Sequence, residues 1–299
     1  MTAAVVREDR CPACGSAEVG LVGQKRGAFR PRAYTVMACG DCGCAYVKDP
    51  DTDFHNLYNM DYYEGRGADP LVSYSSEMRS AERSVRVSEW RGIAQIVLDH
   101  MPVLARKGGT WLDLGCGNGG LIDFVAKHHP SITAIGLEDG EIARKAAALG
   151  RRVYPTQTAS EHQGQCDVVT AIEVLEHCLD PGDVLRRCAD LLRPGGLLFA
   201  TTGNAARQAR VLNWGYLRPE IHITLFTPQA LVRSYERAGL VPTVLGSRGW
   251  RDVIRFKILK NLGQERSAWW HACLPWSLLS RVADHQYGVS AMPCAFKPA

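Results

Sequence analysis

From Gly108 onward the sequence alternates short apolar runs with amphipathic stretches, and this alternation constrains the fold more than any other feature. Asp180-Pro181 and Thr227-Pro228 each combine a capping side chain with a first-turn proline, which predicts two helix starts. Strands and helices that follow one another in this way predict a parallel sheet with helices on both faces. The predicted strands lie within 110–117, 132–139, 166–174, 196–202, 241–247 and 288–296. A further helix is predicted from about Ser76 to His100.

A glycine-rich segment, Asp113 to Gly120, follows the first of these strands and opens a helix. Glycines permit a tight turn and a close approach of the backbone to a ligand. Gly115, Gly117 and Gly120 also satisfy the dinucleotide fingerprint GxGxxG. However, the Asp113 carboxylate would repel a pyrophosphate, and it suits a ligand with an ammonium group, such as the methionine part of S-adenosylmethionine. Glu138 ends the next strand, where it can accept hydrogen bonds from ribose hydroxyls in either class of ligand.

Four segments then occur in one order: LDLGCGNG, IGLED, CDVVTAIEVLEH and LLRPGG. With them, residues 108–245 resemble the class I S-adenosylmethionine-dependent methyltransferases. The resemblance implies an α/β, Rossmann-like sheet of about seven strands, the last antiparallel, with the cofactor at the strand C-termini. It implies cofactor contacts from the glycine loop, the ribose acids, the region after the third strand and the Tyr-Tyr segment: Asp113, Gly115, Cys116, Gly117, Asn118, Gly119, Glu138, Asp139, Gln157 and Tyr63. The acidic residue with which many relatives hold adenine is missing, and Thr156, Gln157 and Thr158 stand there instead.

Five of the eleven cysteines lie in the first fifty residues, where two CxxC pairs are each followed by glycine, and the other six are scattered singly. The pairs are Cys11/Cys14 and Cys39/Cys42, and a hairpin through Ala33–Ala38 fits between them. Two such pairs predict a tetrahedral zinc site with four protein ligands, which is closed and therefore structural. Cys44 is an alternative fourth ligand. Without an export signal, a disulfide scaffold is not expected.

The order of a zinc ribbon, a Tyr-Tyr segment and the class I core resembles a bacterial group of small-molecule methyltransferases. We expect a small zinc-ribbon domain at 1–50, a linker and helical segment at 51–107 and the methyltransferase core at 108–299. In that group the Tyr-Tyr segment lies near the cofactor, so Tyr62 or Tyr63 would cover it or pack between domains. A helical insert at about 249–287 is either a lid over the cleft or a part of the core or of a dimer contact.

Candidate bases follow the fourth and fifth core strands. Glu173, Glu176 and His177 resemble the segment with which ubiquinone-biosynthesis O-methyltransferases hold a divalent metal, and the same residues also fix the loop in metal-free relatives. His222 lies in the loop before the helix at Pro228, where a neutral imidazole would be a suitable base or would shape the loop. Tyr216 and Trp214 are expected to wall the substrate, and His271 is a third candidate base.

The net charge of +4 is mild and scattered, so it does not itself indicate nucleic acid. No apolar run of about 18 residues predicts a membrane span, and the first ten residues show no export signal, so a cytoplasmic location is expected. We predict methylation of an apolar or aromatic small molecule, a secondary metabolite, at oxygen, carbon or nitrogen, and a homodimer is a candidate assembly. There are two alternatives. One is an RNA methyltransferase that uses the zinc ribbon to bind nucleic acid, and the other is a non-catalytic binding module.

Overall fold

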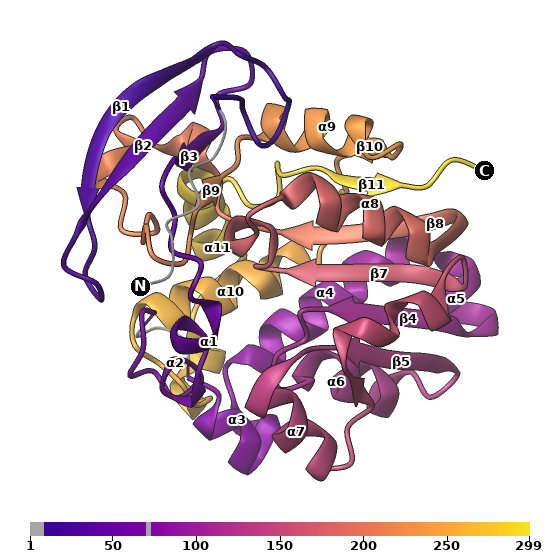
Figure 1. The fold of residues 1–299 in the computed structure, drawn as a ribbon. Helices are drawn as coiled ribbons and strands as arrows, with labels where there is room; N and C mark the ends of the chain where they lie inside the picture. The colour runs from indigo at the N-terminus through magenta and orange to yellow at the C-terminus, as the bar shows by residue number, and fades with distance from the viewer. Residues whose placement is uncertain (1–8, 70–72) are drawn as a thin grey trace.

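The computed structural model describes residues 9–69 and 73–299, so the start of the chain, where the sequence shows no export signal, lies mostly outside the described residues. Its centre is a seven-stranded sheet in the order β10-β11-β8-β7-β4-β5-β6 (Figure 1). The strands are β4 (Gly109–Leu114), β5 (Ile132–Leu137), β6 (Val153–Tyr154), β7 (Cys166–Ile172), β8 (Leu192–Thr201), β10 (Val241–Thr243) and β11 (Cys294–Phe296). Only β11 runs antiparallel to its neighbours among them. The predicted fold class is confirmed.

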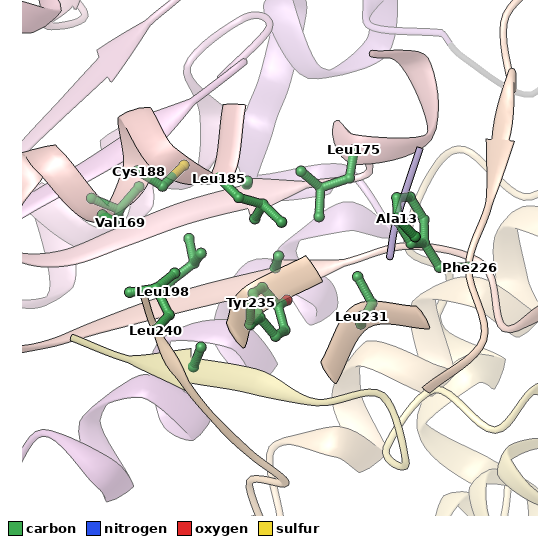
Figure 2. Close-up of a cluster of buried hydrophobic side chains, with 14 of the residues drawn as sticks. Ala13, Val169, Leu175, Leu185, Cys188, Leu198, Phe226, Leu231, Tyr235 and Leu240 are labelled. Carbon is green, nitrogen blue, oxygen red and sulfur yellow. The ribbon is translucent and has the colours of Figure 1, made fainter. Parts of the chain in front are cut away.

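Helices cover both faces of this sheet. Two of these helices precede β4: α4 (Arg86–His100) and α5 (Pro102–Lys107). The helices that follow between β4 and β10 are α6 (Gly120–His128), α7 (Gly140–Ala148), α8 (Pro181–Leu191) and α9 (Pro228–Arg237). Neighbouring strand residues point to opposite cores: Val169 and Leu198 pack with α8 and α9, whereas Val168 packs with α4 and α6. Figure 2 shows the first of these cores, in which Tyr235 of α9 lies between the sheet and the helix.

The two predicted helix starts are confirmed in atomic detail. The Asp180 side chain accepts a hydrogen bond from the Asp183 N–H at 2.9 Å, and Thr227 Oγ1 accepts one from the Ala230 N–H at 3.0 Å. Each satisfies an N–H that has no partner within its own helix.

The helical stretch predicted from about Ser76 to His100 is confirmed, except for a break at residues 84–85. The structure has α3 (Ser75–Ser80), a 3-10 turn at 81–83 and then α4. The break follows from contacts made far along the chain: the Val85 N–H donates to the Glu265 carbonyl at 3.1 Å, and the Ser267 N–H donates to the Arg83 carbonyl at 2.8 Å. These bonds divert the backbone from the helical path, and the local pattern contains no sign of them.

The N-terminal part forms a second sheet of order β1-β2-β3-β9. Its strands are β1 (Val19–Arg26), β2 (Ala33–Cys39), β3 (Ala45–Val47) and β9 (Thr224–Leu225), and the helices α1 (Phe54–Leu57) and α2 (Met60–Tyr63) follow it along the chain. Because β9 belongs to the loop before α9, the ribbon sheet continues directly into the loop that carries His222. The sequence analysis did not anticipate this pairing.

The insert between β10 and β11 contains α10 (Trp250–Asn261), a 3-10 turn at 269–273 and α11 (Trp276–Tyr287). Helix α10 crosses α4 closely: a Cβ on Gly92 would lie 2.6 Å from the Gly249 carbonyl oxygen. Trp250, Val253 and Ile254 are buried in the same core as α4. The insert therefore contributes to the core as well as to the cavity described below.

No helix in the described part of the chain is long and apolar enough to cross a membrane.

Candidate functional site

A cavity of about 1180 Å³ lies at the carboxyl ends of β4, β5, β7 and β8. Gly115 and Glu138 line one side of it, and Glu173 and His222 line another. Residues of α10 complete its wall. This is where an open α/β sheet binds ligands, because the loops after the strands diverge there.

The glycine loop has the backbone that its sequence predicts. Gly115, Gly117 and Gly119 adopt φ of +71°, +56° and +73°, in the left-handed region that side chains disfavour. The Gly117 N–H donates to Glu138 Oε2 at 2.8 Å, and the Asp139 N–H donates to Glu138 Oε1 at 3.0 Å. Two backbone amides thus fix the Glu138 carboxylate at the cavity wall, although burial raises its pKa.

Asp113 lies beneath the loop and is not among the residues that line the cavity in the described structure. Its Oδ1 accepts a hydrogen bond from Thr170 Oγ1 at 2.6 Å, and burial raises its pKa to about 7. Asn118 also lies beneath the loop, where its amide donates to Glu77 Oε2 at 2.8 Å. These side chains support the loop from behind.

The other predicted cofactor residues divide into two sets. Tyr63, Gly115, Gly117, Glu138 and Asp139 line the cavity. Four others do not line the cavity in the described part of the chain: Cys116, Asn118, Gly119 and Gln157. The Gln157 side chain is exposed to solvent. Tyr62 and Tyr63 both line the cavity, and the Tyr63 ring stacks on Tyr74 with centroids 5.6 Å apart.

Two glutamates meet at the hydroxyl of Tyr216. Glu173 Oε2 lies 2.9 Å from this hydroxyl, Glu176 Oε1 is in close contact with it, and the Gly203 N–H donates to it at 3.1 Å. A phenol has one proton and two lone pairs, and the amide uses one lone pair. The hydroxyl can therefore donate to one carboxylate only, and the second carboxyl group must carry a proton and donate to the phenol.

The charges nearby show which glutamate carries that proton. Burial alone would raise the pKa of Glu173, but Lys257 Nζ lies 3.1 Å from its Oε1 and lowers the pKa below its usual range. Burial and the negative charge of Glu173 raise the pKa of Glu176. Glu173 has φ of +54°, the only non-glycine residue with positive φ in the described chain. Such strain is concentrated at functional sites.

Two histidines lie beside this cluster. The His222 ring stacks on Tyr216 at 4.2 Å between centroids, and the His177 ring meets His222 edge-on at 4.8 Å. His222 Nδ1 lies 2.5 Å from the Tyr216 carbonyl oxygen, and His177 Nδ1 lies 2.9 Å from the Tyr58 hydroxyl. Burial lowers the pKa of both, to about 3 for His177, so both imidazoles are neutral near pH 7. His271 is buried elsewhere and is not part of the described cavity lining.

The predicted metal ligands were Glu173, Glu176 and His177, but the structure groups a different set of three residues. Glu173 is held by Lys257, whereas Glu176, His177 and His222 each offer a ligand atom within 4.8 Å of the others. One carboxylate and two imidazoles suit a transition-metal ion better than Mg²⁺, which prefers oxygen ligands.

The four predicted zinc ligands converge at the base of the ribbon. Their sulfurs lie within 4.8 Å of one another, with Cys11 Sγ to Cys42 Sγ and Cys14 Sγ to Cys39 Sγ both 3.6 Å. Tetrahedral Zn–S bonds of ~2.3 Å place sulfurs roughly 3.8 Å apart, and a disulfide would need ~2.05 Å. Gly15 and Gly43, with φ of +79° and +71°, form the turns. The geometry fits zinc.

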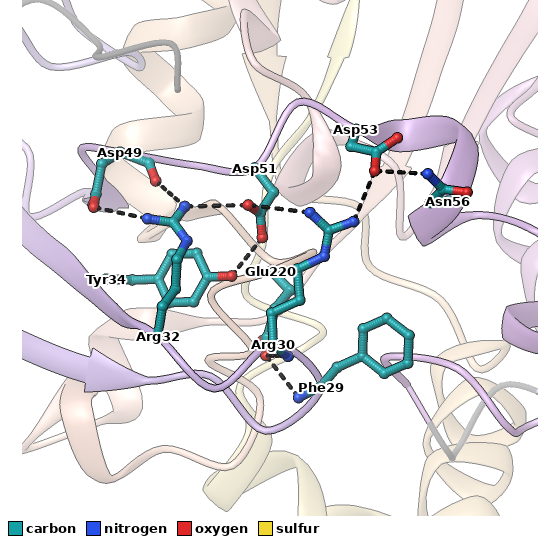
Figure 3. A network of polar contacts seen from close by, with 9 residues as sticks. All are labelled: Phe29, Arg30, Arg32, Tyr34, Asp49, Asp51, Asp53, Asn56 and Glu220. Atoms are coloured by element: carbon teal, nitrogen blue, oxygen red, sulfur yellow. Dashed lines mark hydrogen bonds and ion pairs between the residues drawn. The ribbon is translucent and has the colours of Figure 1, made fainter. Parts of the chain in front are cut away.

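The basic side chains of the ribbon are largely occupied. Arg30 lies 3.4 Å from Asp51 and 3.0 Å from Asp53, and Arg32 lies 3.1 Å from Asp49 and 3.3 Å from Asp51 (Figure 3). Lys25 Nζ donates to the Leu212 carbonyl at 2.6 Å. These cations hold the linker and the neighbouring loop, so they are poorly placed to bind phosphates.

The cavity residues that sequence reasoning missed include Tyr58, Arg218, Lys257 and Lys260. The two lysines lie on α10, and no motif marks them. Their spacing of three residues places them on one helix face, and this was the only signal available.

This cavity, with a glycine loop after β4 and a fixed carboxylate after β5, defines the fold class of the class I S-adenosylmethionine-dependent methyltransferases. Residues 88–244 match a family model described as a methyltransferase domain. Because the match covers just over half of the chain, the protein belongs to this methyltransferase family.

Relatives in the comparisons include ubiquinone biosynthesis O-methyltransferases. The protein of Aeromonas salmonicida is 38% identical over 170 residues, which cover 50% of this chain and 71% of that one. The protein of Caulobacter vibrioides is 40% identical over 114 residues, 36% of this chain and 45% of that one. The match thus spans less than half the length of several such relatives. Among solved structures, the plantazolicin methyltransferase BamL has a TM-score of 0.50 and 11% identity, with 82% of this chain and 96% of that chain covered. This likeness concerns the fold alone.

Proposed function

We propose that the protein transfers a methyl group from S-adenosylmethionine to a hydroxyl group of a small, mainly apolar or aromatic molecule. The observation that supports this most directly is the layout of one cavity: Glu138 and the glycine loop lie on one side, and neutral imidazoles and a carboxylate on another. A hydroxyl acceptor must lose a proton, and this arrangement offers groups that can take it.

On the cofactor side, the Glu138 carboxylate would accept hydrogen bonds from the ribose hydroxyls, because the amides of Gly117 and Asp139 already hold it in place. Gly115 and Gly117 line the cavity, and their positive φ forms the turn that brings their backbone to the place where the cofactor would bind. Asp113 would act from below, where its carboxylate favours a positively charged methionine end. Tyr63 would cover the cofactor from α2.

On the acceptor side, His222, His177 and Glu173 remain the proposed proton acceptors. Methyl transfer is an in-line displacement, so these residues need only orient the acceptor oxygen and remove its proton. His222 and His177 are better placed than Glu173: both line the cavity, are neutral and are held at Nδ1, by the Tyr216 carbonyl oxygen and the Tyr58 hydroxyl, whereas Glu173 is paired with Lys257. Trp214 and Tyr216, stacked at 4.8 Å, would wall the acceptor.

Two metals enter this proposal in different roles. Cys11, Cys14, Cys39 and Cys42 would hold a structural zinc ion. As an alternative to base catalysis by the histidines, Glu176 would lose its proton and, with His177 and His222, hold a divalent ion, which when bound would lower the pKa of an acceptor hydroxyl. Retained activity after dialysis against a chelator that leaves the zinc in place would remove the second metal from the account.

Methylation of a small molecule is favoured over methylation of RNA because Arg30 and Arg32 are bound to aspartates. The test is release of S-adenosylhomocysteine in an unbiased screen of phenols and other hydroxylated metabolites. Turnover of at least one hydroxylated acceptor is expected, and it should be lost in His222→Ala. Turnover on tRNA with a steep salt dependence would favour the RNA alternative. Cofactor binding without turnover on any acceptor would favour a non-catalytic module.

A further inference from the structure

Lys260 differs from the other cations that line the inner part of the cavity. Arg86 binds Glu77 at 2.8 Å, Arg218 lies 3.4 Å from Asp69, and Lys257 lies 3.1 Å from Glu173. Within the described residues, Lys260 has no ion pair or hydrogen bond, and its Nζ lies 5.8 Å from the Phe256 ring centroid. Among the half-buried cations described in the cavity wall, Lys260 is therefore the unmatched one, whereas Arg144, also without an ion pair, is exposed to solvent.

The lack of an anionic partner for Lys260 costs free energy, and the surroundings of its ammonium group explain why. The charged groups that face it are Arg86, Asp69, Glu89 and Glu173, and the three acids already have arginine or lysine partners. Burial, and then the nearby Arg86, lower the pKa of Lys260. A partly buried ammonium group without an anion is poorly solvated, so an anionic ligand group would stabilise it.

The position of Lys260 distinguishes acceptor from cofactor. The family model matches residues 88–244, which include the glycine loop and Glu138, whereas Lys260 belongs to α10, beyond that match. The glycine loop and Glu138, which carry the proposed cofactor contacts, lie inside this match, so a group beyond it is the better candidate for the acceptor. Phe256 and Tyr287, which also line the cavity, come from the same insert and supply aromatic surface beside the ammonium group.

We propose that Lys260 is an anchor for a carboxylate on the acceptor, and that Phe256 and Tyr287 hold the apolar body of that molecule. The acceptor class is then an aromatic or apolar hydroxy acid. A single ammonium group matches the single charge of a carboxylate, whereas a phosphate dianion would need further donors. This inference rests on the proposed function, since it assigns the acceptor half of the same cavity.

The test compares benzoate with its neutral analogue benzamide by ligand-observed NMR titration of the full chain, with and without saturating S-adenosylhomocysteine. Benzoate is expected to bind about tenfold more tightly than benzamide, the size expected for one charge-assisted hydrogen bond. Lys260→Met should abolish this preference, and Lys260→Arg should retain most of it. Lys107→Met, an exposed lysine of α5, is the matched control and should change nothing.

Three results would overturn the inference. One is equal or undetectable binding of benzoate by the wild-type protein, and another is an unchanged benzoate preference in Lys260→Met. The third is a tenfold loss of S-adenosylhomocysteine affinity in Lys260→Met, which would assign the ammonium group to the carboxylate of the cofactor. Failure of the proposed function looks different: the wild-type protein would not bind S-adenosylhomocysteine, while a benzoate preference that depends on Lys260 would still be measurable without it.

Discussion

Thr227 connects the N-terminal ribbon to the methyltransferase core through a single hydroxyl group. Its Oγ1 donates to the Cys42 carbonyl oxygen at 2.6 Å and accepts from the Ala230 N–H at 3.0 Å, so the same atom contacts a CxxC knuckle and caps α9. Arg237 of the same helix donates to the Ala13 carbonyl at 3.0 Å in the other knuckle. The ribbon therefore stabilises the start of α9 and the loop before it, which carries His222.

Replacing Thr227 by valine should destabilise the protein by ~1–2 kcal/mol, because it removes the helix cap and the bond to the ribbon together. Chemical denaturation of purified protein measures this. Thr227→Ser should keep most of the stability, since serine can make both bonds. A valine variant as stable as the wild type would show that this hydroxyl is not needed.

Changing Cys11 and Cys39 to serine should remove about one zinc ion per chain and unfold the ribbon, because thiolate ligands hold both knuckles. Elemental analysis and limited proteolysis read out the two effects. Cys273→Ser, an exposed cysteine outside the ribbon, serves as the control. Full stability of metal-free protein would contradict a structural zinc site.

Asp113 provides a prediction in which stability and binding change in opposite directions. Its pKa of about 7, raised by burial from 3.8, means that the folded state binds more protons than the unfolded state between these values. Stability from this group is therefore lost as pH rises from roughly 4 to 7. Asp113→Asn should be at least as stable as the wild type at pH 8, since its amide oxygen can still accept from Thr170.

The affinity for S-adenosylmethionine should change in the opposite direction as pH rises. A cationic methionine end stabilises the ionised aspartate, so the affinity of the wild type for S-adenosylmethionine should rise about tenfold between pH 5.5 and 7.5. In Asp113→Asn this rise should be absent and the affinity at pH 7.5 lower. Calorimetry at several pH values decides; parallel pH profiles for the two proteins would exclude Asp113 from cofactor recognition.

Tyr216→Phe should reduce kcat by about ten- to a hundredfold with little change in cofactor affinity. Without the hydroxyl, the ionised Glu173 and the protonated Glu176 lose the group that bridges them, so the carboxyl groups beside His222 are no longer held in place. Trp214→Phe, a change in the neighbouring wall residue, should affect KM more than kcat. Equal kcat values for Tyr216→Phe and wild type would remove the bridge from the mechanism.

The sequence predicted the parts of the molecule that are local in the chain. The strand–glycine–helix unit around Gly117, the caps at Asp180 and Thr227 and the two CxxC knuckles depend on residues within a few positions of one another. Each is set by turn chemistry or capping, which neighbouring residues determine.

The sequence could not predict what depends on distant segments. The break before α4 is caused by residues near 265, and β9 joins a strand that is almost 180 positions away. In the site, Glu173 pairs with Lys257 and does not belong to the possible metal-ligand cluster that contains Glu176 and His177. In the sequence, however, these three residues look like one motif. An ion pair across 84 positions has no local pattern.

The most direct test of the account is calorimetric titration of S-adenosylmethionine into the wild type and Glu138→Ala, with NAD titrated in parallel. We expect the wild type to bind S-adenosylmethionine and not NAD, and Glu138→Ala to lose about a hundredfold in affinity, because two hydrogen bonds to a carboxylate disappear. Glu141→Ala, a change at an exposed acid on the rim of the same cavity, should bind as the wild type does. Binding of NAD in preference, or an unchanged affinity in Glu138→Ala, would contradict the account.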